Sequence, residues 1–167
     1  VMIRLLTGST HTGKTLLAQR LLERHGAPYL SIDHLKMGLI RSGMCPLTPE
    51  SPDEALTAVL WPVVREIVKT AVENGQSLTV EGCYIPFNWR EDFDASYLPH
   101  IRFLCLVFSE AYIRTRFDAI QTHANAIERR KDDSFCTMEL LLAENRRNLE
   151  ACRRRGLPYY LIDGPYA

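Results

Sequence analysis

Eight residues near the beginning of the chain match the pattern G-x-x-x-x-G-K-[S/T], and they are Gly8, Ser9, Thr10, His11, Thr12, Gly13, Lys14 and Thr15. A short apolar run precedes them and leucines at helical spacing follow, so the pattern joins a strand to a helix. In that setting, backbone N–H groups of the loop surround phosphate oxygens, and the helix N-terminus adds a partial positive charge. We therefore expect a phosphate-binding loop, in a fold where a strand leads directly into a helix.

The residue types in this loop predict what it binds. Lys14 is expected to hold the β- and γ-phosphates of a nucleotide, and the Thr15 hydroxyl is expected to bind Mg²⁺. The six residues before them are expected to surround the phosphates, with His11 as a loop side chain of no further role. The sequence has no guanine-reading N-K-x-D motif, which favours ATP over GTP. ATP and Mg²⁺ are therefore the predicted cofactors.

Apolar runs and helical repeats alternate along the whole chain. The predicted strands cover residues 3–7, 28–32, 77–81, 101–108 and 159–162, and the predicted helices cover 16–25, 34–41, 52–74, 110–116 and 135–155. Ser51, before Pro52, is expected to cap the third helix. Parallel strands need crossover helices, and such crossovers are right-handed. The alternation predicts an α/β fold with a five-stranded parallel sheet, helices on both faces, and one domain over residues 1–167.

Two acidic residues stand at the ends of predicted strands, where open α/β sheets place their ligands. Asp33 is a candidate to accept the proton of a substrate hydroxyl, while Lys36, one helical turn on, holds an acidic group of the same substrate. Helix capping is the alternative role for Asp33. Glu81 is a candidate to orient Mg²⁺ or its water, or else a solvated carboxylate. The acceptor region is expected at about 33–60, with Arg41, Glu81 and the 84–90 loop, Arg90 included, as further pocket residues.

Basic residues cluster in the second half of the chain. Arg116 lies on the helix after the fourth strand, and the run Arg129-Arg130-Lys131 precedes two aspartates. Planar guanidinium groups make paired contacts with phosphate oxygens and stabilise the charge that develops during phosphoryl transfer. We expect Arg116 and Arg130 to close over the nucleotide on a short lid at about residues 117–133. A solvated basic face is the alternative interpretation.

Charge and hydropathy argue against several classes of function. Lys plus Arg and Asp plus Glu number 20 each, and this zero net charge disfavours nucleic-acid binding by bulk charge. No apolar run approaches the roughly 20 residues of a membrane helix, and no secretory signal pattern begins the chain. Five cysteines without a C-x-x-C pair favour reduced thiols over disulfides or zinc. We expect a cytoplasmic monomer, or a small oligomer, whose partner is a small molecule.

On these residues the chain resembles the small phosphate-loop kinases, and most of all the adenylate kinase group. The loop at 8–15 carries the resemblance, together with the 30–36 segment L-S-I-D-H-L-K. The run Arg130-Lys131-Asp132-Asp133 is similar to the end of the family's lid, where the arginine contacts the transferring phosphates. Arg116 falls where the family has the arginine that covers the ATP base. The resemblance implies the strand order 2-3-1-4-5 and an ATP-dependent phosphotransferase.

Two departures from the adenylate kinase pattern concern the acceptor. Lys36 stands where the family has arginine. The third strand continues as Glu81-Gly82-Cys83-Tyr84-Ile85-Pro86, without the family's G-[F/Y]-P-R motif. This Glu-Gly strand end is also similar to that of the 2-phosphoglycerate kinase-like and zeta-toxin-like kinases, whose acceptors carry a hydroxyl and whose aspartate serves as the base.

The predicted function is transfer of the γ-phosphate of MgATP to a small molecule, with a nucleoside monophosphate as the first candidate acceptor. Three alternatives stay open: transfer to a metabolite hydroxyl with Asp33 as base, ATP binding without turnover, and phosphorylation of nucleic-acid ends, which the zero net charge disfavours. The predicted catalytic residues are Lys14, Asp33, Arg116 and Arg130, the acceptor-binding residues are Asp33, Lys36, Arg41, Glu81 and Arg90, and the metal ligands are Thr15 and Glu81.

Overall fold

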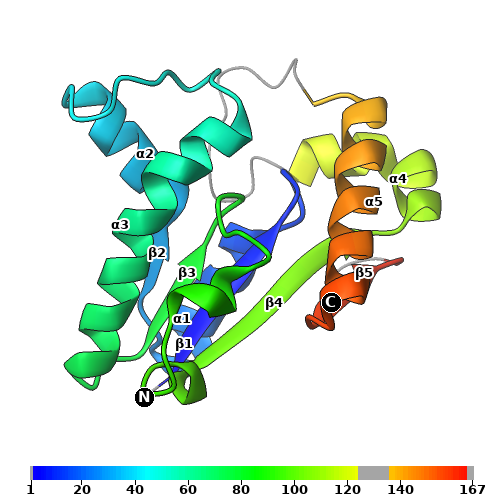
Figure 1. Ribbon diagram of the computed structural model, residues 1–167. Helices are drawn as coiled ribbons and strands as arrows, with labels where there is room; N and C mark the ends of the chain where they lie inside the picture. The colour runs from blue at the N-terminus through cyan, green and yellow to red at the C-terminus, as the bar shows by residue number, and fades with distance from the viewer. Residues whose placement is uncertain (1, 124–135, 165–167) are drawn as a thin grey trace.

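The computed structural model describes residues 2–123 and 136–164 (Figure 1). The strands are β1 (Ile3–Gly8), β2 (Tyr29–Ser31), β3 (Leu78–Glu81), β4 (Ile101–Phe108) and β5 (Tyr159–Ile162). The helices are α1 (Lys14–His25), α2 (Ile32–Arg41), α3 (Asp53–Glu73), α4 (Glu110–His123) and α5 (Met138–Arg155), with the short 3₁₀ helices η1 (Trp89–Asp92) and η2 (Leu98–His100) before β4. All five predicted strands are present, with boundaries within one residue of those expected from the sequence.

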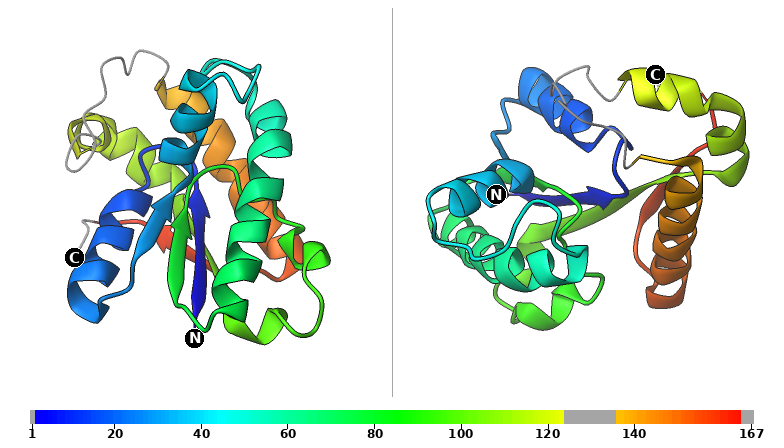
Figure 2. Two further views of the ribbon diagram at one scale, coloured as in Figure 1. Left: turned by 90° about the vertical axis from the view of Figure 1, so that its left-hand side faces the viewer. Right: turned by 90° about the horizontal axis from the view of Figure 1, so that it is seen from above.

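The five strands form one parallel sheet in the order β2-β3-β1-β4-β5, as predicted. Seen from above in Figure 2, α1 and α4 lie on one face of the sheet and α3 and α5 lie on the other. The central strand β1 is paired with β3 on one side and β4 on the other. The residue that follows β1 therefore emerges in the middle of the sheet, with neighbouring strand ends on both sides.

Strand β4 shows why the sheet is buried on both faces. Its residues Phe103, Cys105 and Val107 belong to the hydrophobic cluster that includes α3, whereas Leu106 and Phe108 belong to a second cluster that includes α4. Alternate side chains of a strand point to opposite faces, so a continuous apolar run needs cover on both sides. The helices of the two layers provide that cover.

Several helix boundaries differ from the sequence predictions. Helix α1 begins at Lys14 instead of residue 16, and α4 continues to His123 instead of ending at residue 116. Helix α2 begins at Ile32 instead of residue 34, because β2 ends at Ser31 and Ile32 already packs its side chain in the core. Helix α3 begins at Asp53 after Pro52, and Ser51 does not cap it; the Ser51 hydroxyl instead accepts a hydrogen bond from the backbone N–H of Thr48. Helix α5 begins at Met138, not at 135, since Thr137 caps it by accepting from the N–H of Leu140.

The carboxyl end of the sheet gathers the segments that could hold a ligand. Figure 1 shows α2, the start of α3 and the first half of α5 around this end. All five cysteines are free thiols in this structure. Within residues 2–123 and 136–164, no helix is long and apolar enough to cross a membrane.

Candidate functional site

The loop between β1 and α1 begins at a glycine that no other residue could replace without movement. Gly8 has a backbone φ of 144°, in a region that favours glycine. It is paired in register with Leu106 of β4, and a Cβ on Gly8 would lie 2.4 Å from the Leu106 carbonyl oxygen and 2.9 Å from Thr12 Oγ1. The first glycine of the motif thus lets the loop start against the backbone of β4.

Lys14 is the first residue of α1 and is buried, with 7% of its surface exposed. Its Nζ donates a 2.7 Å hydrogen bond to the carbonyl oxygen of Ser9, and it lies 3.4 Å from Thr12 Oγ1. The Thr12 hydroxyl donates to the same Ser9 carbonyl at 2.8 Å. The ammonium group is therefore held inside the curve of the loop, where phosphate oxygens would meet a positive charge and the helix N-terminus.

Thr15 and Glu81 meet beside this lysine. The Thr15 hydroxyl donates to Glu81 Oε1 at 2.9 Å, and Glu81 is 1% exposed at the end of β3. Burial raises the pKa of Glu81 above its ordinary value, and the charge of Lys14 offsets part of that rise. A hydroxyl and a carboxylate are hard oxygen ligands of the kind that Mg²⁺ prefers, so these two residues fit the predicted metal.

Asp33, Lys36 and Tyr84 form a second group next to the loop. Lys36 Nζ lies 3.3 Å from Asp33 Oδ1 and donates a 3.0 Å hydrogen bond to the Tyr84 hydroxyl. Burial lowers the pKa of Lys36, but the Tyr84 hydroxyl and the Asp33 carboxylate raise it more, so that its pKa lies above the ordinary value. Burial raises the pKa of Tyr84 to about 12. A carboxylate and an ammonium group thus face the carboxyl end of β3 from one turn of α2.

Asp33 is not a helix cap, contrary to the alternative that the sequence left open. The N-cap residue of α2 is Ser31, and Asp33 lies within the first turn of the helix. Its side chain is 37% exposed and its only ion pair among the described residues is with Lys36. An acidic residue in the first turn is a favourable neighbour for the positive end of the helix dipole.

Within the described residues, no hydrogen bond or ion pair joins Arg41, Arg90 or Arg116 to the phosphate loop, Asp33 or Lys36, so their predicted roles stay predictions. Arg41 is exposed at the last position of α2. The Arg90 guanidinium lies 5.5 Å from the Trp89 ring, and Trp89 stacks on Phe103 of β4 at 5.8 Å, below the level of the loop. Arg116 is exposed on α4, at a break in helical geometry (φ −128°, ψ 24°).

The predicted lid lies mostly outside the described residues. Residues 117–123 form the end of α4, and Arg130 with the rest of the lid falls in the part of the chain that is not described. Arg116 and Arg130 therefore stay predictions as residues that close over the nucleotide.

Glu144 of α5 is a site residue that the sequence did not indicate. Its Oε2 accepts a hydrogen bond from the hydroxyl of Ser9, the second residue of the loop. Ser9 is 3% exposed and Glu144 is half-buried, so this contact is partly shielded from solvent. The helical spacing of 138–155 predicted the helix but could not show which of its polar residues would meet a loop about 135 positions away.

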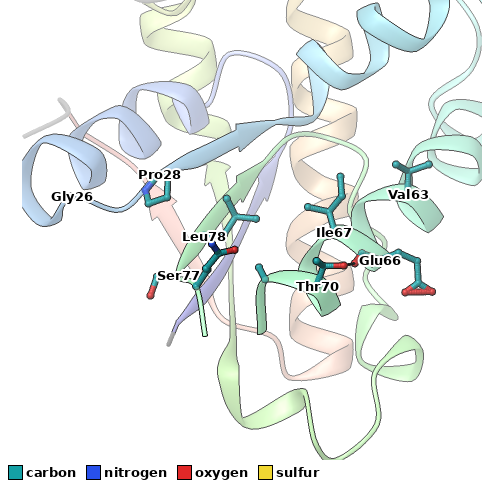
Figure 3. Close-up of a pocket in the computed structure, with 10 residues that line it drawn as sticks. Gly26, Pro28, Val63, Glu66, Ile67, Thr70, Ser77 and Leu78 are labelled. Atoms are coloured by element: carbon teal, nitrogen blue, oxygen red, sulfur yellow. Dashed lines mark hydrogen bonds between the residues drawn. The ribbon is translucent and has the colours of Figure 1, made fainter. Parts of the chain in front are cut away.

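An open groove of about 850 Å³ lies at the other end of the molecule (Figure 3). Pro28, Ser77 and Leu78 line it near the beginnings of β2 and β3, and Val63 and Ile67 line it from α3. None of the described loop residues lines this groove, nor do Asp33 and Lys36. We therefore do not assign the groove to the candidate site.

Comparison with known proteins supports the fold. No protein-family model matches the sequence, and no match is found among curated proteins. Among solved structures, a gluconokinase from Sinorhizobium meliloti aligns with a TM-score of 0.56 and 17% identity over 99% of this chain and 84% of that chain. A sugar kinase from a Janibacter species aligns with a TM-score of 0.55 and 18% identity over 99% of this chain and 87% of that one.

A shikimate kinase from Bacteroides thetaiotaomicron aligns with a TM-score of 0.57 and 12% identity over 97% of this chain and 85% of that chain. None of these three is named an adenylate kinase, so the resemblance to that group stays a prediction. Each alignment spans nearly the whole of this chain. The chain therefore shares the α/β fold of these three kinases.

Proposed function

We propose that this protein is an ATP-dependent phosphotransferase that moves the γ-phosphate of MgATP to a hydroxyl group of a small molecule. The observation that carries the proposal is the position of Lys14, buried inside the loop with its Nζ on the Ser9 carbonyl, next to the Thr15–Glu81 hydrogen bond. These groups supply the positive charge and the oxygen ligands that a triphosphate and its metal require.

The chain's own residues account for nucleotide binding. Backbone N–H groups of the loop and the N-terminus of α1 would receive the phosphate oxygens, and Lys14 would leave the Ser9 carbonyl to contact the β- and γ-phosphates. Thr15 and Glu81 would hold Mg²⁺, which neutralises charge on the phosphates when it is bound. Arg116 and Arg130 are proposed to approach the same phosphates.

The residues expected to bind the acceptor, Asp33 and Lys36, favour an acceptor that carries a hydroxyl group. Asp33 is the carboxylate that would accept the hydroxyl proton, and Lys36 is close enough to hold its side chain in place. The ammonium group of Lys36 is already paired with Asp33 and hydrogen-bonded to Tyr84, so an anionic acceptor would first have to displace Asp33 from it. The gluconokinase, sugar kinase and shikimate kinase with the same fold are consistent with such acceptors.

An assay of ADP release with MgATP tests this function. The wild-type protein would be supplied with sugars, sugar acids, other hydroxylated metabolites and nucleoside monophosphates, with Lys14→Ala as the inactive control. Asp33→Asn should lower turnover of a hydroxyl acceptor by about 10²-fold or more while the Kd for MgATP stays unchanged. Asp94→Asn is the matched control, because Asp94 lies in the turn before η2 and its contacts are with Ser96.

A nucleoside monophosphate is the second candidate acceptor. Lys36 favours it, because this ammonium group lies beside Asp33 at the carboxyl end of the sheet and a phosphate could displace Asp33 from it. A phosphate oxygen already carries charge, so no strong base is needed, and Asp33→Asn would then leave turnover near wild-type. Tight MgATP binding with no transfer to any acceptor of the panel would instead favour a nucleotide-binding protein without turnover.

A further inference from the structure

Ser9 connects the phosphate loop to two other groups at once. Its carbonyl oxygen accepts hydrogen bonds from Lys14 Nζ at 2.7 Å and from the Thr12 hydroxyl at 2.8 Å. Its own hydroxyl donates to the carboxylate of Glu144 on α5. The residue that holds the lysine of the loop is thus itself held by a carboxylate from a helix that follows β4.

The position of Glu144 is fixed by its neighbour in α5. Asn145 is 2% exposed, its Oδ1 accepts from the backbone N–H of Phe108 at 2.8 Å, and its Nδ2 donates to the Leu141 carbonyl at 2.8 Å. Phe108 is the last residue of β4, the strand that pairs with β1 directly before the loop. Asn145 therefore anchors α5 to the end of β4 at the position next to Glu144, which keeps the Glu144 carboxylate beside the loop.

The charge of Glu144 is not balanced by an ion pair in the part of the chain that the structure describes. The Ser9 hydroxyl is the described group that donates a hydrogen bond to it. A loop that receives phosphates gathers N–H groups and a lysine, so a fixed carboxylate beside it acts against the binding of anions. A purely structural anchor for Ser9 would need only a neutral acceptor.

We propose that Glu144 is a positioning residue that holds the loop through Ser9 and, by its negative charge, lowers the affinity of the loop for the phosphates of the nucleotide. The inference rests on the proposed function, since it assumes that the loop binds a nucleotide. Weaker binding of phosphates would favour release of the ADP product, a step that limits turnover in many enzymes.

Three variants separate the charge from the hydrogen bond. Glu144→Gln keeps an oxygen that accepts from Ser9 and removes the charge, whereas Ser9→Ala keeps the charge and removes the donor. Glu150→Gln is the matched control, because Glu150 is an exposed carboxylate of the same helix. Binding of MgATP, MgADP and inorganic tripolyphosphate would be measured by titration calorimetry at low and high salt, without an acceptor, and unfolding would be followed for each variant.

Glu144→Gln should bind all three ligands about threefold to tenfold more tightly than wild-type at low salt, and the gain should shrink as salt screens the charge. Its stability should stay close to that of wild-type, and Glu150→Gln should bind like wild-type. Unchanged affinity in Glu144→Gln, with loss of stability in Ser9→Ala, would overturn the inference and leave Glu144 as a structural anchor.

The same titrations separate this inference from the proposed function. If wild-type binds MgATP but Glu144→Gln does not bind it more tightly, the inference alone is wrong. If wild-type binds neither MgATP nor tripolyphosphate, the proposed function is wrong and the inference is wrong with it. Because Glu144→Gln is nearly isosteric, a change in its affinity cannot be attributed to a lost side chain.

Discussion

The hydroxyl of Thr15 donates a 2.9 Å hydrogen bond to Oε1 of Glu81, although 66 positions separate the two residues in the chain. The contact forms because β1 and β3 are neighbours in the sheet, with Leu6 opposite Glu81, so that the loop after β1 passes over the end of β3. It places a buried carboxylate beside the last residue of the phosphate loop. This pairing determines what we expect from changing Glu81.

Glu81→Gln should raise the Mg²⁺ concentration needed for half-maximal ADP release by about tenfold or more, because one charged oxygen ligand is lost. The amide oxygen can still accept from Thr15, and removing a buried charge should leave the free energy of unfolding unchanged or higher. The measurement is a Mg²⁺ titration at fixed ATP, with urea unfolding alongside. Glu150→Gln, on the exposed face of α5, should leave the titration unchanged. An unaltered Mg²⁺ requirement in Glu81→Gln would remove Glu81 from the metal site.

Tyr84→Phe should weaken binding of the acceptor without changing the affinity for the nucleotide. The Tyr84 hydroxyl accepts from Lys36 Nζ, and loss of a hydrogen bond to a charged group corresponds to about a tenfold change in an equilibrium. We therefore expect the KM for the acceptor to rise by about tenfold while the Kd for MgATP stays the same. Tyr97→Phe is the matched control, since the Tyr97 hydroxyl bonds to Glu73 at the end of α3. If Tyr84→Phe lowered the affinity for MgATP as much as it raised the KM for the acceptor, Tyr84 would not belong to an acceptor site distinct from the nucleotide site.

Two glycine substitutions should change stability in opposite directions. Gly8→Ala puts a Cβ 2.4 Å from the Leu106 carbonyl oxygen at a φ of 144°, so we expect a loss of about 2–4 kcal/mol in the free energy of unfolding. Gly38 lies in α2 with open space around it, and Gly38→Ala should stabilise the protein by about 0.5–1 kcal/mol through helix propensity. Urea unfolding of both variants and of wild-type measures the two effects.

The sequence predicted the sheet well because its signals are local. The apolar run of 101–108 and the glycines that end α1 and α5 each mark an element within a few residues, and alternating strands and helices leave few ways to connect them. The motif at 8–15 likewise depends on neighbours in the chain. The order of the strands came from the resemblance to a known family, and the structure confirms it.

Contacts between distant segments could not be predicted in the same way. Nothing in the spacing of α5 indicates that Glu144 meets Ser9, and nothing in the loop after β3 indicates that Tyr84 meets Lys36 while Arg90 turns to Trp89. These pairs depend on the rotation of a helix and the path of a loop, which are set by packing of the whole core. The prediction that Ser51 caps α3 was wrong for a similar reason, since the Ser51 hydroxyl accepts a hydrogen bond from the backbone N–H of Thr48 instead.

Because Trp61 donates a hydrogen bond to Asp92, we expect truncation of the Asp92 side chain to lower the free energy of unfolding. Trp61 is 5% exposed on α3, and its indole Nε1 donates to Asp92 Oδ2 at 2.7 Å across to η1. Asp92→Ala leaves this buried N–H without an acceptor, so the free energy of unfolding should fall by about 1–3 kcal/mol. Asp92→Asn keeps an acceptor oxygen and should recover most of that loss.

Urea unfolding of the two Asp92 variants makes the comparison, and the ADP-release assay should show little change because neither residue touches the phosphate loop or Asp33. Glu91→Ala, in the same 3₁₀ helix but exposed, should leave stability within about 0.5 kcal/mol of wild-type. Equal destabilisation by Asp92→Ala and Asp92→Asn would mean that the charge of Asp92, 4.0 Å from Arg65, matters more than its hydrogen bond to Trp61. The indole would then have to be satisfied by another partner when Asp92 is shortened.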